Sequence, residues 1–238
     1  MPNFKGLDLT GKTTIVIGAS RANRGIGAAI AIRLDQRGAN VVVNYTSNKS
    51  AQRAIGVVKN IEAAGSQATI CQASVANVAA LGVDANLDQG TEELFQTHFD
   101  TNVKGPIFLT QAVIPHIAKG GRVVFVSSAA SRLGVAGQTV YGATKAANES
   151  CARVWAKELG QSYGITVKCV NLGPVSTGQW QESDDQFRED MQPLIESTPA
   201  AARIAEVDDI APLVDFLCTD VARWATGSVH CANGGLYN

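Results

Sequence analysis

The 238-residue sequence predicts one α/β domain, residues 1–238, built on a doubly wound parallel sheet. Three observations predict this fold. Short apolar segments alternate with longer segments of helical periodicity, which is the pattern of consecutive strand–helix–strand units. A glycine-rich loop separates the first apolar segment from the first helical one. With 45% hydrophobic and 17% charged residues, the chain can form one core, and its length is short for two full domains.

The first part of the chain predicts three strands and two helices. Strands are expected at Thr13–Gly18, Asn40–Asn44 and Gln67–Cys71, and helices at Gly25–Arg37 and Ala51–Ala64. In the first helix, Ile26, Ile30 and Leu34 recur at helical spacing. No internal repeat or linker interrupts the pattern, so we expect a single unit.

The second part begins with a long helix, expected over Thr91–Ala118. Four apolar side chains recur there every fourth residue and are predicted to face inward: Phe95, Phe99, Val103 and Ile107. Residues 178–205 are polar and irregular and are predicted to form a lid. The remaining elements are strands at Gly121–Ser127, Thr166–Asn171 and Ser228–Cys231, helices at Tyr141–Tyr163 and Val207–Leu217, and a turn at 233–235.

Composition argues against several classes of protein. Lys and Arg number 20 against 21 Asp and Glu, and the net charge of −1 lacks the basic surplus of a nucleic-acid-binding protein. No apolar run reaches the length of about 18 residues that spans a membrane. The first ten residues contain no apolar signal segment, so we expect a cytoplasmic protein. The five cysteines are expected to be free thiols, and the three scattered histidines predict no metal site.

The loop at residues 18–27 has the features of a phosphate-binding turn. It follows a strand and opens a helix, where glycines let the backbone approach a pyrophosphate and the helix N-terminus supplies N–H donors. This context predicts a Rossmann-type dinucleotide site, with a plain glycine-rich turn as the alternative. The candidate cofactor-binding residues are Gly18, Ser20, Arg21, Asn23, Arg24, Gly25, Ile26 and Gly27.

The end of the second strand indicates which dinucleotide binds. An NAD site usually has a carboxylate there, which accepts hydrogen bonds from the ribose hydroxyls. The residues here carry no carboxylate and are Asn44, Tyr45, Thr46 and Ser47. Arg21 and Arg24 add cations that attract a 2′-phosphate. The sequence therefore favours NADP (NADPH), with solvated loop charges as the alternative interpretation of the two arginines.

Three residues form a candidate catalytic group. Tyr141 and Lys145 stand four apart at the start of a helix and share one face, and Ser128 follows the preceding strand. Reduction of a ketone needs a proton donor at the oxygen while a hydride reaches the carbon, and a tyrosine beside an ammonium suits that task. A serine hydroxyl can orient the same carbonyl. An isolated Tyr–Lys pair is usually a solvated helix pair, and its place in a dinucleotide fold favours catalysis.

Together these motifs resemble the short-chain dehydrogenase/reductase family, in its ketoreductase-like branch, over nearly the whole chain. The resemblance rests on GASRANRGIG at 18–27, NVKG at 102–105, SS at 127–128 with YGATK at 141–145, GPVST at 173–177 and NGG at 233–235. It implies that Tyr141 is the general acid and base and that Ser128 orients the carbonyl. It implies further that Lys145 holds the nicotinamide ribose and that Asn102 holds a water.

The same resemblance assigns the rest of the cofactor site and the activity. It implies adenine contacts from Ser74 and Val75, and nicotinamide contacts from Gly173, Val175 and Thr177. The chain is most similar to reductases of oxoacyl thioesters and polyhydroxynaphthalenes. The implied activity is therefore NADPH-dependent reduction of a small-molecule ketone on a hydrophobic or aromatic, polyketide-like or oxoacyl substrate.

Two alternatives stay open on this fold: a non-redox cyclase or dehydratase, and a dinucleotide-binding regulator without activity. Members of the family usually form homodimers or homotetramers. The helices that form those contacts correspond to Thr91–Ala118 and Tyr141–Tyr163, so the resemblance implies a homodimer or homotetramer here.

The chain departs from the family pattern in three places. Leu172 and Lys168 stand where Pro and Asn are usual, and we expect both substitutions to be tolerated. Six residues, 19–24, separate the first two loop glycines where three are usual. About twenty residues, a helix and a central strand, are missing between Leu81 and Gly82, and losing a central strand leaves ladder groups of both neighbours unpaired. Either the molecule carries residues absent from this sequence, or residues 77–83 fill the place as a compressed strand, or the chain is a natural truncation with weakened cofactor binding.

Overall fold

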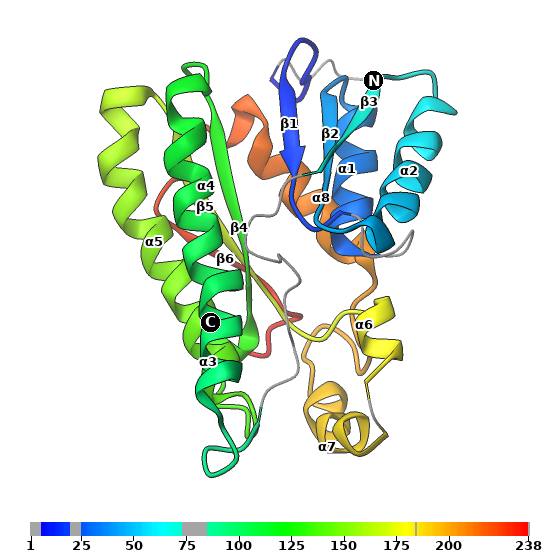
Figure 1. Ribbon diagram of the computed structural model, residues 1–238, viewed down its shortest axis with the longest axis vertical. Coiled ribbons are helices and arrows are strands. Elements are labelled where there is room, and N and C mark those ends of the chain that lie inside the picture. The colour runs from blue at the N-terminus through cyan, green and yellow to red at the C-terminus, as the bar shows by residue number, and fades with distance from the viewer. Residues whose placement is uncertain (1–5, 20–24, 73–84, 184, 238) are drawn as a thin grey trace.

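The computed structural model describes residues 6–19, 25–72, 85–183 and 185–237, and strands and helices alternate along it as the sequence predicts (Figure 1). All strand pairs are parallel. One sheet has the order β1-β2-β3, formed by Thr13–Val16, Asn40–Tyr45 and Ala68–Gln72. The other has the order β4-β5-β6, formed by Arg122–Ser128, Thr166–Leu172 and Val229–Ala232.

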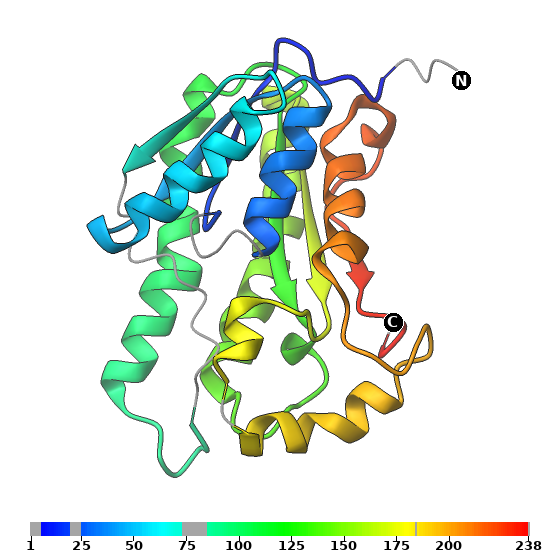
Figure 2. The same cartoon turned by 90° about the vertical axis from the view of Figure 1, so that its right-hand side faces the viewer.

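The α/β class is thereby confirmed, and so are the predicted helices around the sheets. The helices are α1 (Ile26–Gln36), α2 (Asn48–Glu62), α3 (Glu92–Phe99), α4 (Gly105–Val113), α5 (Thr139–Tyr163), α6 (Gly178–Gln181), α7 (Asp185–Glu196) and α8 (Val207–Cys218). In Figures 1 and 2, α3, α4 and α5 lie with the β4–β6 sheet, and α1 and α2 with the β1–β3 sheet. The described residues thus form two halves, each a parallel sheet with its own helices.

Within the described residues, no strand pairs β1 with β4. β1 is hydrogen-bonded along its length only to β2, and β4 only to β5. The division falls where the motifs predict a missing central strand. One consequence is that Ile15, in the middle of β1, is 51% exposed. The predicted break at Leu81–Gly82 and the segment 77–83 lie outside the described residues.

Helix α8 joins the two halves. It packs against α1 on one side and against β4, β5 and β6 on the other. Val43 of β2, Val170 of β5 and Leu217 of α8 belong to one buried cluster, and each has 0% of its surface exposed. At the edge of this contact, the buried carboxylate of Asp215 accepts from the Arg37 side chain at 3.0 and 3.1 Å. Side chains of α8 therefore bridge the gap between the sheets.

The predicted long helix is continuous, but the side that it buries is not the side that the sequence predicted. Residues 100–104 form a π-helical turn between α3 and α4. Phe95 is 47% exposed, so the prediction that it faces inward is wrong, whereas Phe99, Val103 and Ile107 are half-buried. A four-residue step advances 400° on a helix of 3.6 residues per turn, so such a repeat drifts around the axis. The buried positions are instead His98, Thr101, Asn102 and Gly105.

The predicted lid, residues 178–205, is not irregular. It contains α6 and α7, which Figures 1 and 2 place below the carboxyl ends of the strands. Its two ends are held together, because the Ser176 N–H donates to the Ala205 carbonyl at 2.7 Å. In α7 the inward side includes Phe187, Met191 and Ile195, at helical spacing. Pro193 lies inside α7, although proline usually disfavours the interior of a helix.

Lys168, on the central strand β5, is fully buried. Its ammonium donates to the Leu217 carbonyl at 2.7 Å and to Thr166 Oγ1 at 3.0 Å. Leu217 lies in the last turn of α8, where backbone carbonyls lack helical partners and attract a cation. Burial, with a smaller contribution from Arg122, lowers the pKa of Lys168 from 10.5 to about 8.

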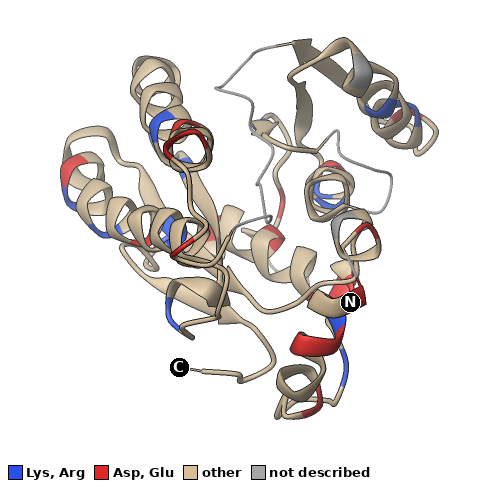
Figure 3. Ribbon diagram, turned by 60° about the horizontal axis from the view of Figure 1, so that its bottom comes forward, with Lys and Arg blue, Asp and Glu red and all other residues tan. Residues whose placement is uncertain are grey.

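Residues of both charge signs are interspersed along the helices, as the colouring of the ribbon in Figure 3 shows. In the parts of the chain that the structure covers, no helix is long and apolar enough to cross a membrane.

Candidate active site

The first part of the site is the turn from β1 into α1. Gly18 has φ +80°, which favours glycine, and the chain enters α1 through Gly25, whose N-cap position has no side-chain hydrogen bond. Gly27 packs so closely that a Cβ there would lie 2.8 Å from Ala19 Cα. The two described ends of this turn therefore have the glycine conformation and the close packing that a phosphate loop requires. The predicted contacts Ser20, Arg21, Asn23 and Arg24 lie outside the described residues.

The end of β2 lies at the same edge of the parallel sheet. Asn44 is buried, and its Nδ2 donates to the Cys71 carbonyl at 3.3 Å. Tyr45 Oη donates to Gln72 Oε1 at 3.4 Å. Thr46 follows, and Ser47 begins α2 as a capping box with Ser50. Residues 44–47 at the end of β2 thus carry no formal charge. The predicted adenine contacts Ser74 and Val75 fall outside the described part of the chain.

The second part of the site lies at the start of α5. Lys145 is 6% exposed, and its Nζ donates to the Val126 carbonyl of β4 at 3.0 Å. The same Nζ lies 5.4 Å from the centre of the Tyr141 ring. The His98 ring approaches the Tyr141 ring edge-on, with 6.2 Å between centres. The predicted Tyr–Lys pair therefore shares one face of the helix, against β4 and α3.

Ser128 and Asn102 approach this helix from two other elements. Ser128 is the last residue of β4, and its Oγ accepts from the Ala130 N–H at 3.3 Å. Gly142 packs against that same loop, since a Cβ on it would lie 2.7 Å from the Ala130 oxygen. In the π-helical turn, Asn102 Nδ2 donates to Thr144 Oγ1 at 3.1 Å. The structure thus brings all four predicted catalytic residues to α5.

The segment after β5 completes the predicted set. Gly173 follows β5 and packs against Asn233 and Leu236. Val175 is buried and pairs with Ala205, the last residue of the predicted lid. Thr177 caps α6, its hydroxyl accepting from the Trp180 N–H at 3.4 Å. These three residues connect the sheet to the lid at the carboxyl ends of the strands.

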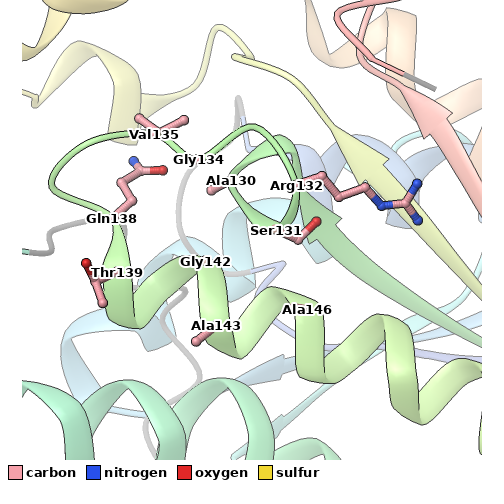
Figure 4. Close-up of a pocket in the computed structure, with 10 residues that line it drawn as sticks. All are labelled: Ala130, Ser131, Arg132, Gly134, Val135, Gln138, Thr139, Gly142, Ala143 and Ala146. Atoms are coloured by element: carbon pink, nitrogen blue, oxygen red, sulfur yellow. The ribbon is translucent and has the colours of Figure 1, made fainter.

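A cavity of about 490 Å³ opens beside the start of α5 (Figure 4). It lies between the loop that follows Ser128 and the first turns of the helix. Its lining residues are Ala130, Ser131, Arg132, Gly134, Val135, Gln138, Thr139, Gly142, Ala143 and Ala146. Small side chains dominate the helix side, and Arg132 supplies the one formal charge among the lining residues.

The sequence did not single out Glu149, which the structure places in this region. Glu149 lies one turn after Lys145 and is 4% exposed. Burial disfavours its ionised form, but hydrogen bonds from Asn171, Ser131, Arg132 and Ser127 outweigh this effect and lower the pKa of Glu149. The residue is therefore an ionised carboxylate inside the protein. No local pattern predicts it, because its partners come from β4, β5 and the loop between β4 and α5.

The described residues fit a dinucleotide at its pyrophosphate end. At the N-terminus of α1, Gly25 offers no capping side chain and Gly27 carries no Cβ. Such an N-terminus attracts phosphate. Where the structure describes the chain, no three His, Cys, Asp or Glu side chains gather as metal ligands.

A phosphate-type turn after β1 and a tyrosine beside a buried lysine near the end of β4, both at the carboxyl ends of the strands, are what a nicotinamide-dependent oxidoreductase needs. Comparison with known proteins defines the family. A family model described as enoyl-(acyl carrier protein) reductase matches residues 57–237. The chain belongs to the short-chain dehydrogenase/reductase family of NAD(P)-dependent oxidoreductases.

Several relatives match over nearly the whole chain. A short-chain dehydrogenase/reductase, FrzI, of Cladobotryum sp is 39% identical, with 96% of each chain covered. Hydroxynaphthalene reductase arp2 of Aspergillus fumigatus is 33% identical, with 93% of this chain and 90% of the relative covered. The crystal structure of the angucycline C-6 ketoreductase LanV with bound NADP is similar with a TM-score of 0.85 and 31% identity, covering 96% of each chain.

The alignment lengths bear on the predicted length deficit. The alignment with the Cladobotryum protein runs over 254 positions, yet 96% of this chain is only about 228 of its 238 residues. About 26 aligned positions therefore have no counterpart in this chain. This agrees in size with the helix and strand that the family motifs predict to be missing.

Proposed function

We propose that the protein reduces a ketone to an alcohol with NADPH, on a hydrophobic or aromatic substrate of polyketide-like or oxoacyl type. One observation carries the proposal. Tyr141 lies with its ring centre 5.4 Å from the buried Lys145 ammonium, on a helix that packs against the loop after Ser128. A proton donor, a fixed positive charge and a hydroxyl are thereby held at one end of the sheet.

The chain's own residues account for the acid–base part of this reaction. A bound NADPH supplies the hydride to the carbonyl carbon. Tyr141 Oη gives its proton to the carbonyl oxygen, and the positive charge of Lys145 stabilises the negative charge left on Tyr141. Ser128 Oγ donates a hydrogen bond to the same oxygen and fixes its position. Asn102 holds the first turn of α5 through Thr144 and would order a water near Lys145.

The preference for the phosphorylated dinucleotide rests on charge. The end of β2 has no carboxylate to repel a 2′-phosphate, and Arg21 and Arg24 occur in the adjacent loop. Two similar crystal structures contain NADP, namely LanV and a short-chain dehydrogenase from Burkholderia cenocepacia. We therefore expect NADPH to bind more tightly than NADH.

The substrate class rests on the relatives and on the lid. One relative is named a hydroxynaphthalene reductase, and LanV was solved with rabelomycin as well as NADP. In the lid, the Trp180 and Phe187 rings meet edge to face, with 6.1 Å between centres. Aromatic side chains of this kind offer a surface on which a flat apolar substrate packs.

The proposal is tested by Tyr141→Phe, with Tyr163→Phe as the matched control. Tyr163 ends the same helix and is 47% exposed. We expect Tyr141→Phe to lose about 100- to 10,000-fold in kcat for NADPH-dependent reduction of a naphthol-type ketone, because the proton donor is gone. NADPH binding, followed by fluorescence titration, should remain. Undiminished turnover in Tyr141→Phe, with the control unchanged, would exclude Tyr141 as the donor.

A second candidate is a dinucleotide-binding protein without activity, or a truncated one with weakened binding. The divided sheet favours it, since β1 and β4 are not paired within the described residues. Titration with NADPH separates the two, because a regulator binds without turnover and a damaged chain does not bind. Intact mass decides between a truncation and a longer molecule: a mass of 24.9 kDa excludes residues absent from this sequence.

Assembly into homodimers or homotetramers is part of the same proposal. Phe95 of α3, Phe108 of α4 and Val154 of α5 expose 47%, 58% and 47% of their surface, on the helices that correspond to the subunit contacts of the family. Large apolar side chains exposed to solvent are typical of a subunit interface. Light scattering on the purified protein measures the subunit number, and a monomer at micromolar concentration would contradict this part.

A further inference from the structure

Glu149 divides its two oxygens between two sets of donors. Oε1 accepts from Asn171 Nδ2 at 2.6 Å, Ser131 Oγ at 2.8 Å and Ser127 Oγ at 3.1 Å. Oε2 accepts from Nε and Nη2 of Arg132, at 3.1 and 2.9 Å. Five donors from four residues thus converge on one buried carboxylate.

These donors lie next to the proposed catalytic residues. Asn171 Nδ2 also donates to the Ser128 backbone carbonyl at 2.8 Å. The Ser127 hydroxyl lies 3.2 Å from the Lys145 carbonyl as well as 3.1 Å from Glu149. Glu149 is therefore connected through single side chains to the residues on each side of the reacting centre, on β4 and on α5.

The second oxygen of Glu149 fixes the loop that lines the cavity beside α5. Arg132 has no other acidic partner among the described residues, and its guanidinium also lies over the Tyr237 ring, 5.4 Å from the centre. Both carboxylate oxygens of Glu149 therefore hold the loop after Ser128, Oε1 through Ser131 and Oε2 through Arg132. Hydrogen bonds to an ionised group are stronger than those between neutral groups, so this attachment is firm.

We propose that Glu149 is a positioning residue for ketone reduction, holding Ser128 and the 129–132 loop at a fixed distance from Tyr141 and Lys145. The proposal rests on the proposed function, because it concerns the geometry of that reaction. Glu149 touches no reacting atom. It acts through Asn171, Ser127 and Arg132, and small displacements of a reacting geometry lower turnover sharply.

The two acceptor oxygens of Glu149 are both required. An amide at position 149 has one acceptor and one donor end. In Glu149→Gln, the NH₂ group must face either the guanidinium of Arg132 or Nδ2 of Asn171, and in both cases a donor meets a donor. One set of contacts is then lost whichever way the amide turns.

The first experiment compares Glu149→Gln with Glu158→Gln, which makes the same change at an exposed position of α5. Turnover is expressed per chain that binds NADPH, so that loss of folded protein does not count. We expect kcat of Glu149→Gln to fall about 10- to 100-fold, while the ketone KM and NADPH affinity change by less than about threefold. A corrected kcat within about twofold of wild type would overturn the proposal.

The second experiment uses rescue. In Glu149→Gln with Arg132→Gln, the amide at 149 can turn its oxygen to the Asn171 cluster and its NH₂ to the new glutamine. We expect this double variant to regain at least about tenfold in kcat over Glu149→Gln, whereas Glu149→Ala with Arg132→Gln regains nothing. Equal kcat in the two double variants would show that only the charge balance matters, which contradicts positioning.

Hydrogen exchange separates this proposal from the proposed function. Backbone amides of residues 129–132 should exchange about tenfold faster in Glu149→Gln than in Glu158→Gln, because the loop has lost its attachment. If the wild-type protein reduces no ketone, the proposed function fails and the exchange rates alone test the positioning. Unchanged exchange would overturn it, and so would faster exchange without loss of corrected kcat in an active enzyme.

Discussion

Lys168→Met tests how the protein holds a charged lysine in its core. Methionine keeps the length of the side chain and removes the ammonium, which in wild type contacts the Leu217 carbonyl and Thr166 Oγ1. The variant therefore loses hydrogen bonds, at a cost that does not depend on pH, and it also loses a titrating group. Only the second effect makes the stability difference between the two proteins change with pH.

The size of that change follows from the two pKa values. In the folded protein the pKa of Lys168 is about 8, against 10.5 in the unfolded chain. Between these values the unfolded chain binds more protons, so the free energy of unfolding of wild type rises with pH. Below pH 8 the folded state carries the full cost of charging Lys168, about 3 kcal/mol. From pH 7 to pH 9, wild type should gain about 1–2 kcal/mol relative to Lys168→Met.

Urea denaturation at pH 7, 8 and 9, followed by fluorescence of the three tryptophans, measures this difference. Neighbouring groups interfere little in this range: burial raises the pKa of Cys218 to about 11, and burial followed by the charge of Lys168 lowers the pKa of His230. Lys157→Met, at an exposed site of α5, is the control and should show no pH-dependent difference. A constant difference between wild type and Lys168→Met would refute the reasoning.

Two further predictions concern the phosphate-type turn and the contact between the halves. Gly27→Ala places a Cβ 2.8 Å from Ala19 Cα, so it should lower the free energy of unfolding by about 1–3 kcal/mol and weaken NADPH binding. Gly160→Ala, which has open space on α5, should stabilise by up to about 1 kcal/mol, and equal urea midpoints for the two variants would contradict the close approach. Asp215→Ala removes the carboxylate that accepts from Arg37 and should cost about 1–3 kcal/mol, because the carboxylate is buried and its partner is half exposed. A urea midpoint equal to that of wild type would show that this ion pair contributes nothing.

The sequence was most informative where a short-range pattern decides the structure. Apolar runs such as 41–43 and 123–126 predicted strands that the structure confirms, and the helix carrying Tyr141 and Lys145 was also predicted correctly. The site residues could be named because their spacing along one helix is itself the signal. The family relationship was equally accessible, since its motifs are local.

Features that depend on distant partners could not be predicted. Glu149 receives donors from residues up to 22 positions away, and nothing beside it in sequence indicates them. In the sequence, Lys168 is a polar substitution for the usual Asn that we expect to be tolerated. Only the structure shows that its ammonium is buried against the Leu217 carbonyl at the end of α8, 49 positions further on. Phe95 was wrongly predicted to face inward, because positions four residues apart drift around a helix of 3.6 residues per turn. In each case the deciding contacts join residues that are far apart in the sequence, so only the tertiary structure shows them.

The gap between β1 and β4 has a consequence for how the molecule unfolds. Backbone ladders transmit cooperativity within each three-stranded sheet, but in the described residues no ladder joins the two sheets, and contacts centred on α8 connect them instead. Such contacts open at lower free energy than ladders do. The β1–β3 half, which carries the phosphate-type turn, can therefore open as a separate unit while the half that carries Tyr141 stays folded. A ligand that bridges both halves would couple them into one cooperative transition.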